Sequence, residues 1–406
     1  MQPPQSSVPA RTKTKIIIEY SDSTILDELT PNIHVLRGEV RFRHDGTLLF
    51  CDSAYFYNED NSIEAFSNVR IEQGDSVFIY GDFLTYFGNV GLAQMRDNVR
   101  MENNEMTLFT DHLDFDRMLN LGYFFDGGLL VDSVNELTSV YGQYSPDTKM
   151  ATFKTNVVLT NPQFVLKSDT LEYNTTDHVA TILGPSTIES DSGFIYSSRG
   201  KFNTVTNHAT LYDRSTVVTK DGTKTLTADT LFYNRETGFG EAFSNMVLND
   251  TVKKMLLTGN YGYYDDPTDF AFAMEEKDTT CFNQMKGRLL TAFFTAGELT
   301  QIDVEGNTES IYYPIDEKDG SFISLTKTES KQLMTIYIEN REPVKIWWRP
   351  EPTFNLLPLP DLQPEQKFLK DFIDFNYLRP KDKLDIFTKK DRKAEDIPAP
   401  RRRRKQ

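Results

Sequence analysis

The sequence predicts an all-β fold, an elongated antiparallel jelly-roll or folded sheet built from units of about 30 residues with two strands each. Two short motifs recur with this period, apolar and polar residues alternate inside them, and turn-forming residues separate them. Aromatic residues make up 12% of the chain, a bias that favours strands over helices.

The first motif is a small residue and an aspartate followed by alternating apolar positions, as in Gly81-Asp82-Phe83-Leu84-Thr85-Tyr86. Related copies contain Asp52, Asp111, Asp169 and Asp229. These aspartates occur once per unit, and no second carboxylate follows at a fixed spacing. We therefore interpret them as polar groups at strand edges or turns. A calcium ladder or a glycosidase site is the less favoured interpretation.

The second motif is Ser67-Asn68-Val69-Arg70-Ile71, which returns in altered form at 97–101, 155–159 and 244–248. Turn formers follow at 73–75, 88–89 and 103–104. Two strands and two short turns per unit describe an antiparallel meander.

A sheet of this length must fold on itself to bury its apolar face, and this leaves an apolar groove along its length. Residues two apart on a strand share one face, so alternating apolar positions of both motifs are expected to line the groove or to form a dry core. The expected lining residues are Val69, Ile71, Leu84, Tyr86, Val99, Met101, Leu113, Phe115, Val157, Leu159, Leu171, Tyr173, Leu231 and Tyr233.

Four regions are expected along the chain. Residues 1–15 form a disordered N-terminal segment, and residues 16–274 form the main β-repeat domain. Residues 275–349 continue the same sheet in a looser form, because the register breaks after Ala273. Residues 350–406 form a proline-rich capping segment with a basic tail that ends in four arginines and a lysine before Gln406.

Several classes of function are excluded. The formal net charge of −16 argues against a nucleic-acid binder. The five histidines fall in unrelated phases of the repeat and form no metal-ligand motif, so we expect no metal site. No nucleophile elbow, phosphate loop or dinucleotide fingerprint occurs, so we expect no catalytic residues, no cofactor and no enzyme activity.

The chain offers no run of 18 apolar residues, and its polar N-terminus is unlike a signal peptide. The protein is therefore either cytosolic or has a signal that was removed or lies upstream.

The sequence resembles the organic-solvent-tolerance (OstA-like, LptA-like) family of lipopolysaccharide-transport proteins, in the form found in Bacteroidetes. The resemblance covers roughly residues 15–350 and is carried by Leu36-Arg37-Gly38-Glu39-Val40-Arg41-Phe42, by Cys51-Asp52-Ser53-Ala54-Tyr55-Phe56-Tyr57 and by the two recurring motifs. It implies a β-jelly-roll in the periplasm or cell envelope, associated with the outer membrane and peripheral to membranes.

The resemblance also implies a non-enzymatic conduit for lipopolysaccharide or a related lipid, in which the groove-lining residues named above bind the lipid. The implied partners are other lipopolysaccharide-transport proteins that stack edge to edge on terminal strands. Two alternatives stay open, namely a structural or adhesive β-solenoid with a closed core and a carbohydrate-active β-solenoid enzyme. The enzyme would need a clustered carboxylate pair in adjacent units, which the sequence does not contain.

Overall fold

The protein is described by a computed structural model. It covers residues 14–27, 30–234, 239–252, 255–264, 276–278, 281–295, 298–316, 318, 321–339 and 342–369. The all-β prediction is confirmed, because these residues form 34 strands, two short 3₁₀ helices and no α-helix. The same residues include no helix with the length and hydrophobicity to cross a membrane. The expected basic tail and most of the expected N-terminal segment lie outside the described residues.

The chain divides into two compact units. Unit 1 comprises residues 1–186 and 201–205, and unit 2 comprises residues 187–200 and 206–406. The division passes through β16 (Ser186–Ser190) and β18 (Arg199–Asn203). The region boundaries expected at residues 15, 274 and 349 stay predictions.

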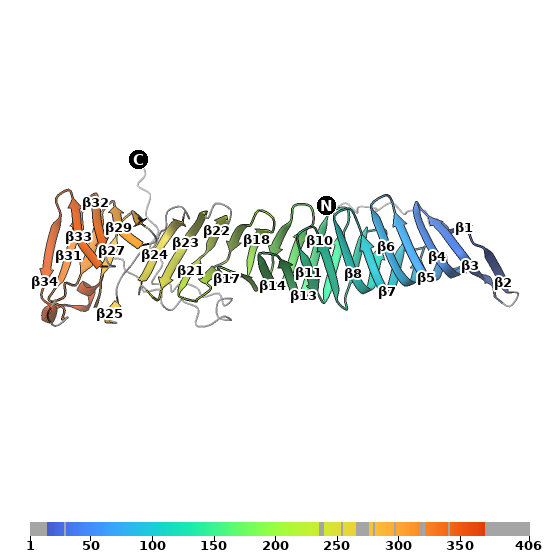
Figure 1. Ribbon diagram of the computed structural model, residues 1–406, viewed down its shortest axis with the longest axis horizontal. Helices are drawn as coiled ribbons and strands as arrows, with labels where there is room; N and C mark the ends of the chain where they lie inside the picture. Colours follow the sequence, from blue (N-terminus) through green and yellow to red (C-terminus); the bar gives the residue numbers. More distant parts are fainter. Residues whose placement is uncertain are drawn as a thin grey trace, which may run out of the picture. The chain divides into compact units, whose positions relative to one another are not determined.

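Unit 1 contains a regular antiparallel meander in which each strand pairs with the next along the chain (Figure 1). Its turns fall where the sequence predicts them, at Gly74 and near Gly88 and Asn103. The strands are β3 (Thr30–His44), β4 (Thr47–Tyr57), β5 (Ser62–Gln73), β6 (Val77–Phe87), β7 (Leu92–Glu102) and β8 (Met106–Asp116).

Alternate long strands bend at their middle. In β5 the residues Ser67 and Asn68 have φ of 61° and 49°, and in β7 Asp97 and Asn98 have φ of 60° and 51°. The pairing register shifts at both places, which is the signature of a β-bulge. Asparagine tolerates this left-handed conformation better than most residues do, which explains why the second motif carries it.

Three of the repeated aspartates bond to residues of these bends. Asn98 Nδ2 donates to Asp82 Oδ2 over 2.6 Å, and Asn68 Nδ2 donates to Asp52 Oδ2 over 2.8 Å. Asn245 makes the corresponding bond to Asp229 in unit 2. The interpretation as strand-edge or turn groups is therefore wrong for Asp52 and Asp82, which lie opposite a bulge in the middle of their strands. Asp229 lies in the bend between the strands 224–228 and 230–234.

The bends divide unit 1 into two layers, as the strands after β8 make plain. The end of β8 pairs with β9 (Leu121–Phe124), whereas its beginning pairs with β10 (Gly128–Asp132). We call layer A the half-strands 53–57, 62–66, 83–87, 92–96, 112–116, 121–124, 141–145, 150–154, 170–174 and 179–182. Layer B is formed by 47–51, 69–73, 77–81, 99–102, 106–110, 128–132, 136–139, 157–161 and 164–168.

The remaining strands of unit 1 follow this division. They are β1 (Ile17–Tyr20), β2 (Ser23–Asp27), β11 (Glu136–Ser139), β12 (Tyr141–Ser145), β13 (Met150–Asn161), β14 (Phe164–Asn174) and β15 (Val179–Ile182). At the N-terminal edge, β1 pairs with the layer B half of β3 and β2 with its layer A half.

Unit 2 begins with a similar antiparallel arrangement. Its strands are β17 (Gly193–Ser197), β19 (His208–Tyr212), β20 (Ser215–Thr219), β21 (Lys224–Ala228), β22 (Thr230–Asn234), β23 (Phe239–Asp250) and β24 (Met255–Tyr264). A short hairpin follows, formed by β25 (Glu276–Asp278) and β26 (Cys281–Phe282).

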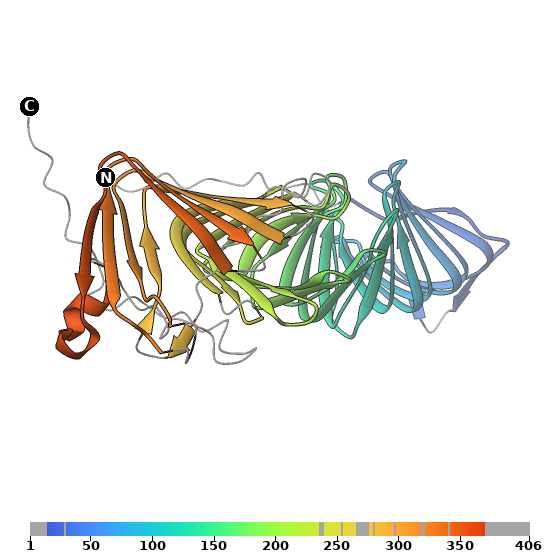
Figure 2. The same ribbon diagram turned by 60° about the vertical axis from the view of Figure 1, so that its left-hand side comes forward.

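The end of unit 2 consists of two four-stranded sheets that diverge from a shared ridge (Figure 2). One contains β27 (Gln284–Lys286), β30 (Thr308–Tyr312), β31 (Leu325–Ser330) and β34 (Thr353–Leu357). The other contains β28 (Leu289–Thr295), β29 (Glu298–Glu305), β32 (Leu333–Glu339) and β33 (Glu342–Arg349). Successive pairs of strands alternate between the sheets, with β28 and β29 in one, β30 and β31 in the other and β32 and β33 in the first again, so this region keeps a two-layer plan.

The described end of the chain packs on the first of these sheets. Two 3₁₀ helices, Leu359–Asp361 and Pro364–Lys367, precede Leu369, which is buried against Ile311 and Leu325. The Gln284 side chain accepts from Leu369 N over 2.9 Å and donates to Lys367 O over 2.7 Å. This segment therefore covers one layer of the terminal sheets.

The bend predicts a specific stability difference at Asn98. Glycine adopts the left-handed conformation without a steric cost, whereas alanine pays about 1–2 kcal/mol. Both substitutions lose the bond to Asp82. Asn98→Ala should therefore be less stable than Asn98→Gly by about that amount in urea unfolding. Equal stabilities would mean that the bend does not depend on this backbone conformation.

Candidate functional site

The predicted lining residues of unit 1 all point into the space between the two layers. Each of the twelve is at most 5% exposed. Layer A contributes Leu84, Tyr86, Leu113, Phe115, Leu171 and Tyr173, and layer B contributes Val69, Ile71, Val99, Met101, Val157 and Leu159. In unit 2, Leu231 is also buried, but Tyr233 is 37% exposed and does not share this environment.

The interior of unit 1 is filled by its own side chains. A cavity near the N-terminal end has a volume of about 20 Å³ and is lined by residues that include Ile16, Gln73, Ala93 and Phe115. That volume holds about one water molecule. An acyl chain fits between the layers only if they separate.

The layers meet again at the ends of the bent strands, and we call this line of contact the mouth. Tyrosines of layer A bond there to polar residues of layer B. Tyr86 Oη lies 2.6 Å from His44 Nδ1, Asn103 donates to Tyr144, and Tyr173 donates to Asp132. The members of each pair are 41 or 42 residues apart, so the same register position makes the contact in these three repeats.

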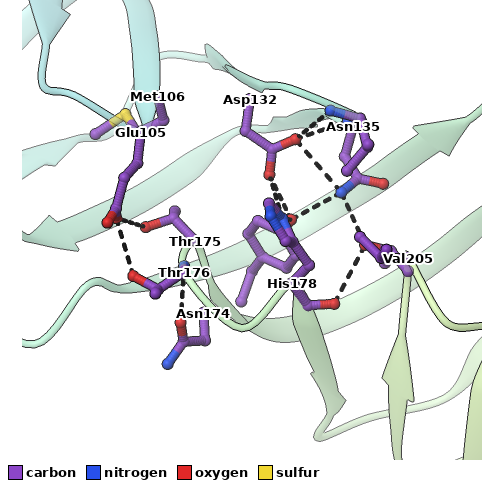
Figure 3. Close-up of polar contacts among 12 residues, drawn as sticks. Glu105, Met106, Asp132, Asn135, Asn174, Thr175, Thr176, His178 and Val205 are labelled. Carbon is purple, nitrogen blue, oxygen red and sulfur yellow. Dashed lines mark hydrogen bonds and ion pairs between the residues drawn. The ribbon is translucent and has the colours of Figure 1, made fainter.

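The contact at Tyr173 is the most elaborate (Figure 3). The Asp132 side chain is fully buried, and its Oδ1 accepts from the backbone N–H groups of Val134 and Asn135, each over 2.8 Å. Asn135 Nδ2 donates to Tyr173 over 2.7 Å and to Thr204 Oγ1 over 2.9 Å. The Nδ1 atom of His178 lies 3.0 Å from the Tyr173 hydroxyl.

Electrostatics keep these tyrosines protonated. Burial, followed by the hydrogen bond to Asp132, raises the pKa of Tyr173. Burial raises the pKa of Tyr86 to about 12 and also raises that of Tyr144. The Tyr173 hydroxyl acts as a hydrogen-bond donor rather than as a nucleophile, although carboxylate, imidazole and hydroxyl groups meet here.

Further side chains cross the mouth beside the tyrosines. Glu105 accepts from the hydroxyl of Thr175 over 3.2 Å and from that of Thr176 over 3.0 Å (Figure 3). Arg117 donates to the carbonyl oxygen of His44 over 3.2 Å and to Asp45 over 3.0 Å. The backbone–backbone hydrogen bonds of the described part of unit 1 stay within one layer or lie at the bend. Side chains therefore hold the mouth closed.

Part of the chain that forms this arrangement matches a known protein family. Residues 13–169 match the family model described as OstA-like protein. This segment is OstA-like. OstA-like domains belong in general to a lipopolysaccharide or lipid transport family and are not known as enzymes. No curated protein matches the chain. The assignment to the Bacteroidetes form stays a prediction.

Two rows of regularly spaced residues, which run from the OstA-like segment to Tyr173, were not predicted from the sequence. The five histidines do fall in different phases of the repeat, but His44 begins a row of polar residues spaced 29 or 30 apart that continues through Gln73, Asn103, Asp132 and Asn161. Tyr86, Phe115, Tyr144 and Tyr173 form a second row with spacings of 29. This regular spacing was the signal that could have located the mouth.

Removing one hydroxyl tests the contact at Tyr173. Tyr173→Phe removes the hydroxyl that donates to Oδ2 of the buried Asp132 carboxylate, so the free energy of unfolding should fall by about 1–3 kcal/mol in urea titrations. Tyr55→Phe is the matched control, because Tyr55 is 39% exposed, and it should change stability little. Equal effects of the two substitutions would contradict the role given to Tyr173.

His44 gives the OstA-like segment a pH-dependent stability. Burial, followed by the nearby Arg117 charge, lowers the pKa of His44. The unfolded chain therefore binds the proton more readily, and the free energy of unfolding should fall as the pH drops below about 6.5. Urea unfolding between pH 8 and 5 should show a shallower fall for His44→Gln. An unchanged pH profile would show that His44 does not contribute.

Proposed function

We propose that this protein is a non-enzymatic lipid conduit of the cell envelope that takes part in lipopolysaccharide transport and outer-membrane assembly. The observation that carries the proposal is the two-layer, apolar interior of the OstA-like segment. Burying each methylene of an acyl chain contributes about 0.8 kcal/mol, so an apolar passage lowers the free energy of a lipid outside the bilayer. The repeat offers successive sites of similar chemistry along the sheet.

Partner proteins of the same transport family are proposed to pair with the terminal strands. The N-terminal edge of unit 1 carries exposed apolar side chains, with Ile17 at 58%, Ile25 at 49% and Leu26 at 58%. The last strands of unit 2 expose Val344 and Leu356 at 54% and 68%. A strand edge with apolar side chains is a template for β-augmentation.

A closed β scaffold is the second candidate, and the packed interior favours it. A scaffold and a conduit differ in whether lipid ever reaches the interior positions. The two candidates therefore make opposite predictions for crosslinking from inside the layers.

Photo-crosslinking in cells distinguishes them. A compact diazirine amino acid at Leu113 or Leu171 should form adducts with lipopolysaccharide, because both positions are fully buried between the layers. Glu172 and Lys167 are the controls, since their side chains point away from the interior on the same strand as Leu171. Asp114 is unsuitable, because it is only 6% exposed and pairs with Arg96.

Adducts at the interior positions that are absent at the controls would support the conduit. A folded, envelope-located protein without interior adducts would overturn it in favour of the closed scaffold. Circular dichroism and protease resistance of each variant verify that the fold is intact.

A further inference from the structure

The row of tyrosines at the mouth is interrupted at one place. Phe115 occupies the register position of Tyr86 and Tyr144, and Gln73 occupies the position of the polar partner on layer B. Phenylalanine has no hydroxyl to donate. Gln73 Nε2 donates to Asn120 over 3.1 Å, but its buried Oε1 has no hydrogen-bond partner in the described structure. The cavity of about 20 Å³ lies beside these two residues.

An apolar side chain from outside the layers borders this cavity. Ile16 is 5% exposed and lines the same cavity as Phe115 and Gln73. It precedes β1 in the chain and belongs to neither layer. Its neighbour Ile17, by contrast, is 58% exposed.

Hydrogen bonds hold the segment 14–16 across the mouth. Asn61, in the turn of layer A, accepts from Ile16 N over 2.9 Å and donates to Thr14 O over 3.1 Å. The Thr14 hydroxyl lies 2.8 Å from Nε2 of His44, which is at the end of layer B. These few contacts involve a side chain in every case, so the segment can leave without breaking the strand ladder.

We propose that the mouth beside Phe115 is an entry subsite for a lipid acyl chain and that Ile16 plugs it until lipid arrives. This inference rests on the proposed conduit function. The subsite accepts a branched aliphatic side chain from the protein itself, which has the chemistry of an acyl chain. Entry there breaks no bond from a tyrosine hydroxyl. It requires only the bond between Gln73 and Asn120 and the side-chain contacts of segment 14–16 to open.

The opening can be measured without lipid by thiol labelling. Ala93 pairs with Tyr86 and Phe115, whereas Ala151 pairs with Tyr144 and Tyr173. Both alanines are buried, at 3% and 0% exposure. The background carries Cys51→Ala and Cys281→Ser, so that each variant has a single thiol. Ala93→Cys places it beneath the part of the mouth beside Ile16, and Ala151→Cys places it beneath the part closed by the hydrogen bonds of Tyr144 and Tyr173.

We expect three differences in labelling rate. The thiol of Ala93→Cys should react faster than that of Ala151→Cys. Adding Ile16→Ala should accelerate labelling at Ala93→Cys by about tenfold, because the burial of an isoleucine side chain is lost. Adding Phe115→Tyr should slow it about threefold to tenfold, because the new hydroxyl can bond to Gln73.

Two controls restrict the interpretation. Ile17→Ala, one residue along the chain, should leave the labelling rate at Ala93→Cys unchanged. Ile16→Ala should leave the rate at Ala151→Cys unchanged, which excludes global unfolding as the cause. Equal effects of Ile16→Ala and Ile17→Ala, or equal acceleration at both thiols, would overturn the plug.

A second experiment tests whether the ligand of this subsite is an acyl chain. A diazirine-bearing fatty acid should give several-fold more adducts on purified Ile16→Ala than on Ile17→Ala, and fewer on Phe115→Tyr than on the unaltered chain. Adduct yields that do not follow this order would overturn the entry subsite. If the order is observed but lipopolysaccharide forms no adducts at Leu113 or Leu171 in cells, the conduit function fails while the subsite stands.

Discussion

The left-handed bend in the middle of the strand is the constraint on which the other features of unit 1 depend. A straight meander would leave one face of the sheet apolar and exposed. Two consecutive residues with positive φ, such as Asp97 and Asn98, bend every second long strand at its middle, so that the two halves of the sheet face one another. The Asn98–Asp82 bond repeats as Asn68–Asp52 and secures the bend from the neighbouring strand. One strand therefore supplies both layers of the core.

The same constraint determines where the protein is strongly and weakly closed. At the bend the layers are joined by continuous backbone and by the hydrogen-bonded ladder. At the mouth they are joined by side chains, among them Tyr86 with His44 and Tyr173 with Asp132. A hydrogen bond between side chains contributes about 0.5–1.5 kcal/mol net, because water replaces it when it breaks. The mouth is therefore the side on which the layers separate at the lower free energy.

The sequence predicts the local features of this fold and misses the long-range ones. Strands, turns and the inward direction of Leu84 and Leu113 follow from alternation and turn chemistry within a few residues. The bend is harder to predict, because Ser67-Asn68 reads as part of a strand until its partner Asp52 is known. The mouth joins residues 41 or 42 positions apart on different layers, and no local pattern connects Tyr86 to His44. In the sequence, only the shared spacing of about 29 residues in the polar row and the aromatic row indicates that these residues meet.

The repeat also explains how a packed interior and a lipid passage are compatible. Each unit contacts mainly its neighbours, so the stability of such an array is close to a sum of local terms. Separating the layers at one position breaks the contacts of that position and leaves the ladder of the adjacent units in place. A single phenylalanine in a row of tyrosines is then sufficient to make one position open more readily than the next. Phe115, with Ile16 seated beside it, is that position in unit 1.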